Sequence, residues 1–353
     1  MSSIFDIEEY VAKANLQGTS IFLYGGRKIG KTTLASKFPK SFIIGFEMGW
    51  GGLNKVKASP VKDWNHFRKD FVKPLVQQAK DFQTGKIKQK VYDTIIIDTS
   101  DIAYNYCTDF INAQEGVTHL DYTENKRGYK MVKNEFAKQM FLLMSSGYIL
   151  IFISHADTKQ VTNLINESGT IRKIKEDKTV PTLDKNAYAI LSGAVDTIAY
   201  CGNMEMENGD MKRVIFFKDN GSFEAGSRWS EFLPDYVDLN YESFESAIIK
   251  SIEAKAKIDG VDPHANHEDK NLYQQAEESI VYDFEAIMAE ISIIGNYLHS
   301  VNKLPLLTKI SDESLGVGKK VSACTEIQVE VVHSILCEIK EKMEEADIVI
   351  PEE

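Results

Sequence analysis

The sequence predicts an α/β fold with a mainly parallel β-sheet, because short apolar stretches of β-favouring residues alternate with segments of helical periodicity. Four such stretches lie in the first 155 residues: 21–24, 41–46, 91–98 and 148–153. The residues that close or follow them are Gly25, Glu47, Asp98 and His155. Since the carboxyl ends of parallel strands meet at one edge of a sheet, where ligands bind in such folds, we expect these four residues to share a site.

The first stretch runs directly into a phosphate-binding motif. Gly25, four residues and then Gly30-Lys31-Thr32 fit the P-loop pattern, and helical composition follows from Thr33 to Phe38. Glycines allow successive backbone N–H groups to converge on a phosphate chain, and the start of the helix adds a positive dipole end. We therefore expect ATP here, with Lys31 on its β- and γ-phosphates and the Thr32 hydroxyl on Mg²⁺. The expected nucleotide contacts are Gly25, Gly26, Arg27, Lys28, Ile29, Gly30, Lys31, Thr32 and Thr33. The alternative is a chance glycine-rich turn before a helix.

Two carboxylates are candidates for the chemistry of hydrolysis. Asp98 ends the run Ile95-Ile96-Ile97 and is predicted to lie near Mg²⁺, through a water molecule. The alternative is an aspartate that only caps the next helix. Glu47 follows the neighbouring strand and is the best-placed general base, unless it is a surface carboxylate beside the turn 49–52.

The charge of the chain is unevenly distributed. The net charge is −11, but residues 260–353 contain 19 Asp and Glu against 7 Lys, which leaves +1 for residues 1–259. The acidic balance therefore does not exclude a nucleic-acid surface on the first 259 residues. The chain has no apolar run of eighteen residues and begins with MSSIFDIEEY. These features predict a cytoplasmic protein, in the host cytosol if phage-encoded, with no membrane association.

Composition and periodicity divide the chain into a P-loop ATPase core (1–257), a linker (258–269) and an acidic helical C-terminal domain (270–353). Helices are expected over 5–17, 63–82 (interrupted at Pro74), 101–145 (with a loop), 243–257 (capped by Ser243), 272–294 and 327–339, with a less regular stretch at 304–321. The four cysteines form no CxxC pair, which favours reduced, mostly buried thiols. His264 and His267 have ligand-like spacing, but a solvated linker is the simpler interpretation.

Two basic segments are candidates for single-stranded DNA. The polar stretch 157–180 is predicted to be a hairpin that turns at Gly169 and carries Arg172, Lys173, Lys175 and Lys178. The segment 126–130 combines cations with Tyr122 and Tyr129, which suits phosphate neutralisation with base stacking. Either segment could instead be a solvated charged face.

Taken together, these features resemble the RecA/RadA-type ATPases, and most closely the short phage-encoded recombinases that promote single-strand annealing. The features are the P-loop, Glu47, IIID at 95–98, Ser154-His155 and RVIFFKDNGSFEAGSRW at 213–229, within a resemblance that spans roughly residues 15–250. The resemblance implies a RecA-like core, Glu47 as catalytic base and His155 as sensor of the γ-phosphate, where a neutral core histidine is the alternative. It also implies a homo-oligomer in which Lys218 or Arg228 reaches the ATP of the next subunit. On the surface, Arg228 could instead pair with Glu224 or Glu231.

The resemblance leads us to expect a DNA-dependent, oligomeric ATPase of phage recombination or annealing. The chain departs from full-length recombinases, because we recognise neither an amino-terminal helix-hairpin-helix module nor a long polymerisation arm. The C-terminal domain has no counterpart in that family. Its acidity points to a single-strand-binding or other replication protein as partner, to a gate over the DNA surface, or to a solubilising face. The alternatives are an ATPase that loads or remodels a replicative helicase and, less favoured, a small-molecule kinase.

Overall fold

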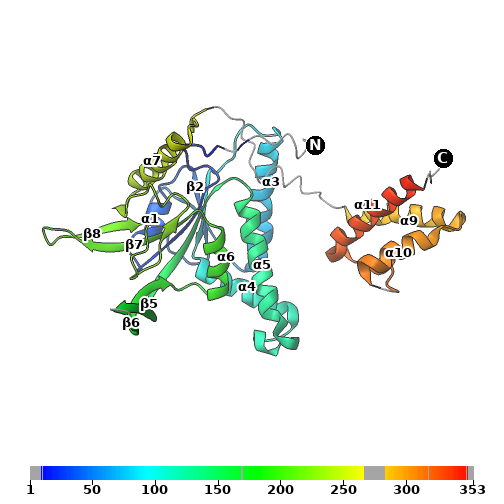
Figure 1. Cartoon of the computed structure of the whole chain (residues 1–353), viewed down its shortest axis with the longest axis horizontal. Helices are drawn as coiled ribbons and strands as arrows, with labels where there is room; N and C mark the ends of the chain where they lie inside the picture. The colour runs from blue at the N-terminus through cyan, green and yellow to red at the C-terminus, as the bar shows by residue number, and fades with distance from the viewer. Residues whose placement is uncertain are drawn as a thin grey trace. The chain divides into compact units, whose positions relative to one another are not determined.

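The computed structural model describes residues 9, 11–167, 170–265, 283–316, 318–346 and 348, with residues 162–167 and 170–174 described by their backbone alone. The chain divides into two compact units, Met1–Leu272 and Tyr273–Glu353. The first unit contains a twisted β-sheet with helices on both of its faces, and the second contains helices (Figure 1).

The sheet is mainly parallel, as the sequence predicts. Within the described residues its strands are β1 (Ser20–Gly25), β2 (Ser41–Gly45), β3 (Lys57–Pro60), β4 (Thr94–Asp98), β5 (Ile149–Glu167), β6 (Thr170–Pro181), β7 (Thr197–Glu205), β8 (Met211–Phe216), β9 (Gly226–Ser227) and β10 (Tyr236–Asp238). The order across the sheet is β10-β8-β7-β1-β5-β4-β2-β3. The pairs from β7 to β3 are parallel, whereas β8 and β10 extend the sheet in antiparallel fashion. The P-loop strand β1 therefore lies at the centre, between β5 and β7.

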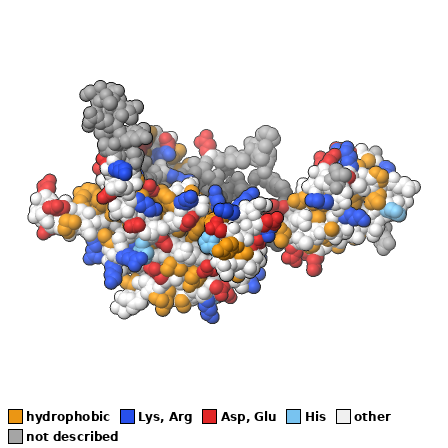
Figure 2. All heavy atoms as spheres, turned by 90° about the horizontal axis from the view of Figure 1, so that it is seen from below, with side chains coloured by type: hydrophobic (Ala, Val, Ile, Leu, Met, Phe, Trp, Pro, Cys, Tyr) orange, Lys and Arg blue, Asp and Glu red, His pale blue; other side chains and the backbone are white. Residues whose placement is uncertain are grey.

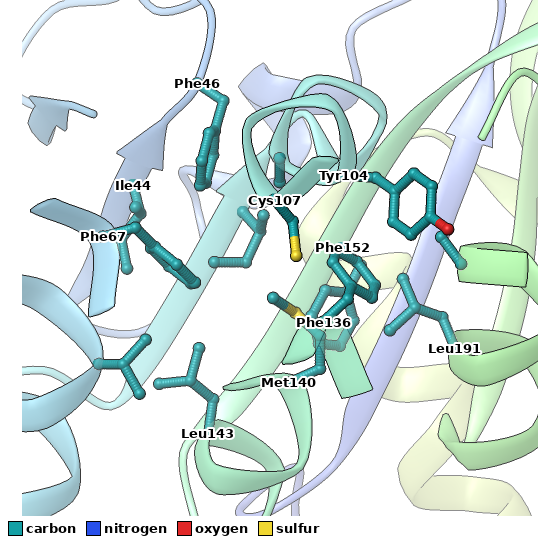
Figure 3. Packing of buried hydrophobic residues seen from close by; sticks show 14 of the residues in the cluster. Ile44, Phe46, Phe67, Tyr104, Cys107, Phe136, Met140, Leu143, Phe152 and Leu191 are labelled. Atoms are coloured by element: carbon teal, nitrogen blue, oxygen red, sulfur yellow. The ribbon is translucent and has the colours of Figure 1, made fainter. Parts of the chain in front are cut away.

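Strand alternation divides the core into two layers. In β1, for example, Ile21 and Leu23 face one apolar cluster and Phe22 and Tyr24 face the other. The first cluster is covered by α1 (Lys31–Ala35) and α7 (Tyr241–Asp259). The second is covered by α2 (Trp64–His66), α3 (Lys73–Gln83), α4 (Ser100–Glu115), α5 (Arg127–Met144) and α6 (Lys185–Ala194). In Figure 3 side chains from β2, β5, α4 and α5 gather in this second layer, including Phe46, Cys107, Phe136 and Phe152.

Several sequence predictions need correction. Residues 11–17, predicted to be helical, form bends and turns, and of the rest of that helix only residue 9 is described. The strand at 148–153 does not stop at Ser154-His155, because β5 continues to Glu167 and pairs with β6 as a long hairpin. The expected hairpin is thus present, while its turn at Gly169 lies outside the described residues. The cap of α7 is Asn240, whose side chain accepts a hydrogen bond from the backbone N–H of Ser243 at 2.8 Å.

Other elements follow the expected pattern with local differences. The run 63–82 contains a π-helical turn, Phe67–Val72, so the change of helix type comes just before Pro74. The helix after the P-loop begins at Lys31 and ends at Ala35, earlier than expected. Short 3₁₀ turns at Leu120–Tyr122 and Glu124–Lys126 join α4 to α5. Two cysteines are buried, Cys107 and Cys201, whereas Cys324 is half-buried and Cys337 is exposed.

The second unit is a small helical domain with its own core. Its described helices are α9 (Phe284–Ser300), α10 (Leu304–Leu315) and α11 (Val329–Glu345), with 3₁₀ turns at Val321–Ala323 and Glu326–Gln328. The core is aliphatic, and Leu298, Val332, Ile335 and Ile339 are fully buried in it. The stretch beginning at residue 304 is a regular helix to Leu315, so the expectation of an irregular segment was wrong there.

Candidate nucleotide-binding site

The predicted site residues converge at one edge and on one face of the sheet. In each strand, the isoleucine that packs beneath α1 lies an even number of residues before the site residue: Ile43 before Glu47, Ile96 before Asp98 and Ile153 before His155. Because side chains alternate between faces, this spacing directs all three polar side chains to the face of α1 and the P-loop. Gly25 completes the edge, because it pairs with His155 on one side and Cys201 on the other.

The P-loop glycines are required by close approach and by backbone conformation. A Cβ atom at Gly25 would lie 2.3 Å from the carbonyl oxygen of Cys201. Because this oxygen belongs to the backbone of β7, it cannot easily move away. Gly30 has φ of +116° at the start of α1, a conformation that side chains disfavour. Arg27, Lys28 and Thr33 are exposed on or beside the loop. The loop can therefore wrap a phosphate chain as the motif predicts.

Lys31 is held inside the loop. Its Nζ donates to the carbonyl oxygens of Gly25 and Gly26, both at 2.9 Å, and the residue is only 5% exposed. Burial lowers the pKa of the Lys31 ammonium, because desolvation disfavours its charge. Phosphate oxygens bound in the loop would replace these carbonyls as acceptors and would favour the charged form.

The Thr32 hydroxyl donates to Asp98 Oδ2 at 2.9 Å, in a pocket where Asp98 is 1% exposed. Burial raises the pKa of Asp98 to about 6, the hydrogen bond from Thr32 opposes this rise, and the charge of Glu47 adds to it. A divalent cation would compensate this buried carboxylate, and a hydroxyl beside it supplies a second oxygen ligand. The donor set therefore fits Mg²⁺, and these are the residues that sequence analysis assigned to it.

Gly49 leaves the space for that ion. A Cβ atom at Gly49 would lie 3.1 Å from Asp98 Oδ2 and 3.6 Å from Thr32 Oγ1. From the sequence, Gly49 belonged only to a glycine-rich turn, so its position at the site was missed. Among the described residues, no group of three or more His, Cys, Asp and Glu could hold a metal by itself. His264 contacts Glu253 at 3.0 Å, and His267 lies outside the described residues.

Glu47 and His155 are in direct contact. The distance between Glu47 Oε1 and His155 Nε2 is 3.2 Å, and the two side chains are 33% and 19% exposed. The backbone N–H of Glu47 donates to the carbonyl oxygen of Asp98 at 3.2 Å. The second ring nitrogen of His155, Nδ1, is buried and has no hydrogen-bond partner in the structure. The candidate base and the candidate sensor thus form one pair beside Thr32 and Asp98, the candidate Mg²⁺ ligands.

Unpaired polar atoms gather at this edge of the sheet. Within the described residues, five buried side-chain atoms have no partner: Thr99 Oγ1, Ser100 Oγ, Asp101 Oδ2, Asn112 Oδ1 and His155 Nδ1. Four of these five belong to residues that directly follow β4 or lie in β5 at the site. Asp101 also accepts hydrogen bonds from Ser154 and Thr182 through Oδ1. Sequence analysis missed Asp101, although its position three residues after Asp98 could have indicated it.

The two candidate fingers do not approach the P-loop of their own chain. Lys218 Nζ contacts Asp235 at 3.1 Å. Arg228 pairs with Asp196 at 3.2 Å, instead of the two glutamates considered from the sequence. Asp196 also accepts from the backbone and the hydroxyl of Ser20, at the start of β1. Arg228 therefore lies at the amino edge of the sheet, opposite the P-loop. A different cation, Arg213, contacts the loop: its Nη1 donates to the carbonyl oxygen of Ile29 at 3.3 Å.

In both candidate DNA segments, some of the cations are paired with carboxylates. In segment 126–130, Lys126 pairs with Asp121 at 3.5 Å and Arg127 with Glu115 at 2.7 Å, so both cations are partly neutralised. In the β5–β6 hairpin, Lys159 lies opposite Lys178 in the register, and Lys178 also contacts Asp219 at 3.1 Å. Basic and acidic side chains are interspersed on the face of the first unit seen in Figure 2.

The family of the chain follows from comparison with known proteins. A family model described as the AAA domain matches residues 17–229, which include every site residue named above. The chain belongs to the AAA domain family. Its P-loop, its Thr32–Asp98 pair and its mostly parallel sheet are those of a P-loop NTPase with a RecA-like core.

Two further similarities describe this AAA domain protein. The SPbeta prophage-derived uncharacterized protein YorG of Bacillus subtilis (strain 168) is 27% identical over 349 residues, covering 97% of this chain and 99% of that protein. The KaiC-like protein PH0186 from Pyrococcus horikoshii OT3 is 13% identical, covers 57% of this chain and 78% of its own, and superposes with a TM-score of 0.30. In the described part of the chain, no helix is long and apolar enough to cross a membrane.

Proposed function

We propose that this protein is an ATPase in which the P-loop with Lys31, Thr32 and Asp98 holds ATP with Mg²⁺. The observation that carries the proposal is the 2.9 Å bond from Thr32 to the buried Asp98, beneath a glycine that keeps the pocket open. The magnesium ion would neutralise charge on the β- and γ-phosphates. Lys31 would contact the same oxygens from within the loop, where its burial strengthens the attraction.

Glu47 is the proposed general base. Its carboxylate belongs to the same face as Asp98, and its backbone is tied to Asp98 by a 3.2 Å hydrogen bond. It would accept a proton from the water that attacks the γ-phosphate, at the Oε atom that now contacts His155. His155 would exchange this contact for one to the γ-phosphate. In this way His155 would act as the sensor, because its position depends on whether ATP or ADP is bound.

We also propose that the ATPase acts as an oligomer on single-stranded DNA, in phage recombination or annealing. The supports are the prophage origin of the YorG relative and the continuity of β5, which runs from His155 into the hairpin with its lysines. In the oligomer, Lys218 or Arg228 would serve a neighbouring site, since their side chains are 39% and 58% exposed. The acidic C-terminal domain (270–353), after the linker at 258–269, would meet a single-strand-binding or replication protein.

Steady-state ATP hydrolysis with Mg²⁺, measured with and without single-stranded DNA, tests the proposal. We expect hydrolysis by the wild type, stimulation by DNA, and loss of turnover with weaker ATP binding in Lys31→Ala. Lys37→Ala is a matched control, because Lys37 is an exposed lysine just beyond α1. Full activity of Lys31→Ala would refute the assigned site. A rate that DNA leaves unchanged would refute only the DNA-dependent part.

A further inference from the structure

The loop that follows β2 connects the candidate base to the metal-binding pair. It begins at Glu47 and ends at Leu53, whose backbone N–H donates to the carbonyl oxygen of Trp50 at 2.8 Å. Near its middle lies Gly49, where an added Cβ atom would meet Asp98 and Thr32, as described above. The loop therefore passes directly over the pair that would hold Mg²⁺, and its conformation decides where the Glu47 carboxylate lies.

Trp50 fixes this loop to the sheet. A Cβ atom built on Gly45 would lie 1.7, 2.1 and 2.9 Å from three carbons of the Trp50 ring. The ring thus lies directly on the backbone of β2, and only glycine can occupy position 45 while it does so. Gly45 pairs with Asp98 in the neighbouring strand β4 and precedes Glu47 by two residues. Trp50 also packs against the apolar cluster beneath α1.

The other contacts to Glu47 are weak by comparison. Its backbone N–H bond to Asp98 is 3.2 Å long, and its carboxylate contact to His155 is also 3.2 Å. Met48, the next residue, is 72% exposed, so little packing restrains the chain there. The Trp50 ring, by contrast, lies on the backbone of β2 and packs against an apolar cluster, and burial of this kind stabilises one conformation over others.

We propose that Trp50, seated on Gly45, is a positioning residue that holds Glu47 in place for hydrolysis. The inference rests on the proposed role of Glu47 as base, and it adds that the base depends on a contact outside the P-loop and the metal pair. Misplacement of a catalytic group by about 1 Å can lower a rate by roughly 10²-fold. Nucleotide affinity should be unaffected, because Lys31 and the loop glycines bind the phosphates independently of Trp50.

Four variants test the contact: Trp50→Ala, Trp50→Phe, Gly45→Ala and the double variant Gly45→Ala/Trp50→Ala. For Trp50→Ala we expect kcat to fall by about 10- to 100-fold while the Kd for ATP stays within about 2-fold. Trp50→Phe should recover most of the rate, since a smaller ring can still lie on Gly45. Gly45→Ala should lower kcat as Trp50→Ala does, because the added methyl group displaces the ring.

The double variant provides the sharpest comparison. Once the ring is removed, the methyl group at position 45 has nothing to displace, so the double variant should be no slower than Trp50→Ala alone. Gly52→Ala is the control in the same loop, because a Cβ atom there would meet nothing within 4 Å. A Gly45→Ala protein that fails to fold, together with a double variant that folds, would also support the contact.

The outcomes separate this inference from the proposed function. If Glu47→Gln loses turnover while Trp50→Ala keeps the wild-type kcat, the positioning role is wrong and the base assignment stands. If Glu47→Gln keeps full turnover, the base assignment itself fails. The inference would also be overturned if the loss of kcat in the double variant equalled the product of the losses in Gly45→Ala and Trp50→Ala. The two residues would then act separately.

Discussion

Asp98→Asn should stabilise the protein in the absence of Mg²⁺ and nucleotide while it removes Mg²⁺-dependent hydrolysis. Burial raises the pKa of the Asp98 carboxyl from its usual 3.8 to about 6, and this shift already includes the attraction of Lys31. Between about pH 4 and pH 6, the native state therefore keeps a proton on Asp98 that the unfolded chain has already released. Stability falls as the pH rises from about 4 to about 6, and the loss is complete above that range.

A shift of about two pKa units corresponds to about 3 kcal/mol at pH 8, and to about half of that at pH 5. Asparagine is uncharged and can still accept the hydrogen bond from Thr32, so the variant should avoid this loss. Urea unfolding in EDTA at pH 5 and pH 8 measures the free energy of unfolding of the wild type and of Asp98→Asn. We expect the difference between Asp98→Asn and wild type to widen with pH. A variant that is less stable than wild type at pH 8 would refute the argument that this carboxylate is poorly compensated.

Three further predictions concern the pocket, the interface and the second unit. Gly49→Ala should raise the Mg²⁺ concentration needed for half-maximal activity, because its methyl group would lie 3.1 Å from Asp98 Oδ2; an unchanged Mg²⁺ titration would contradict this. Arg228→Ala should bind ATP but lose turnover, by up to roughly a thousandfold, and regain some on mixing with Lys31→Ala subunits. Flat specific activity on dilution, with no recovery on mixing, would mean that each chain has a complete site. Deleting 273–353, which contain 16 acidic residues against 6 lysines, should leave single-stranded DNA binding unchanged or strengthen it; loss of binding by a folded, ATP-binding truncation would move the DNA surface to the second unit.

The sequence was sufficient where a site depends on local pattern. Gly25 to Thr32 follow a fixed spacing, and Asp98 ends a run of isoleucines that is typical of a buried strand, so their positions could be predicted from neighbours in the chain. Because parallel strands run in the same direction, these residues could also be expected together at the carboxyl edge of the sheet. The contact of Glu47 with His155 is consistent with that reasoning, because both residues were expected at the same edge.

The sequence was insufficient where two interacting residues are far apart in the chain, and where a polar segment could be either a loop or an exposed strand. Arg228 forms an ion pair with Asp196, which lies 32 residues earlier in the chain, and no spacing rule predicts this pair. Beyond His155, β5 leaves the core and, among the described residues, pairs with β6 alone. This part of the strand is therefore polar, and its composition resembles that of a loop. The contact of Trp50 with Gly45 depends on tertiary packing. No sequence pattern indicates that a glycine in a strand and a tryptophan in the following turn touch each other.

The central claim is that this edge of the sheet hydrolyses ATP with Glu47 as the base. The most direct test is to measure ATP binding and ATP turnover side by side for wild type and Glu47→Gln, in the presence of Mg²⁺. Glutamine keeps the size of the side chain but cannot accept the proton, so we predict that binding stays as in wild type and turnover falls by at least about 100-fold. Turnover at the wild-type rate in Glu47→Gln would contradict the account.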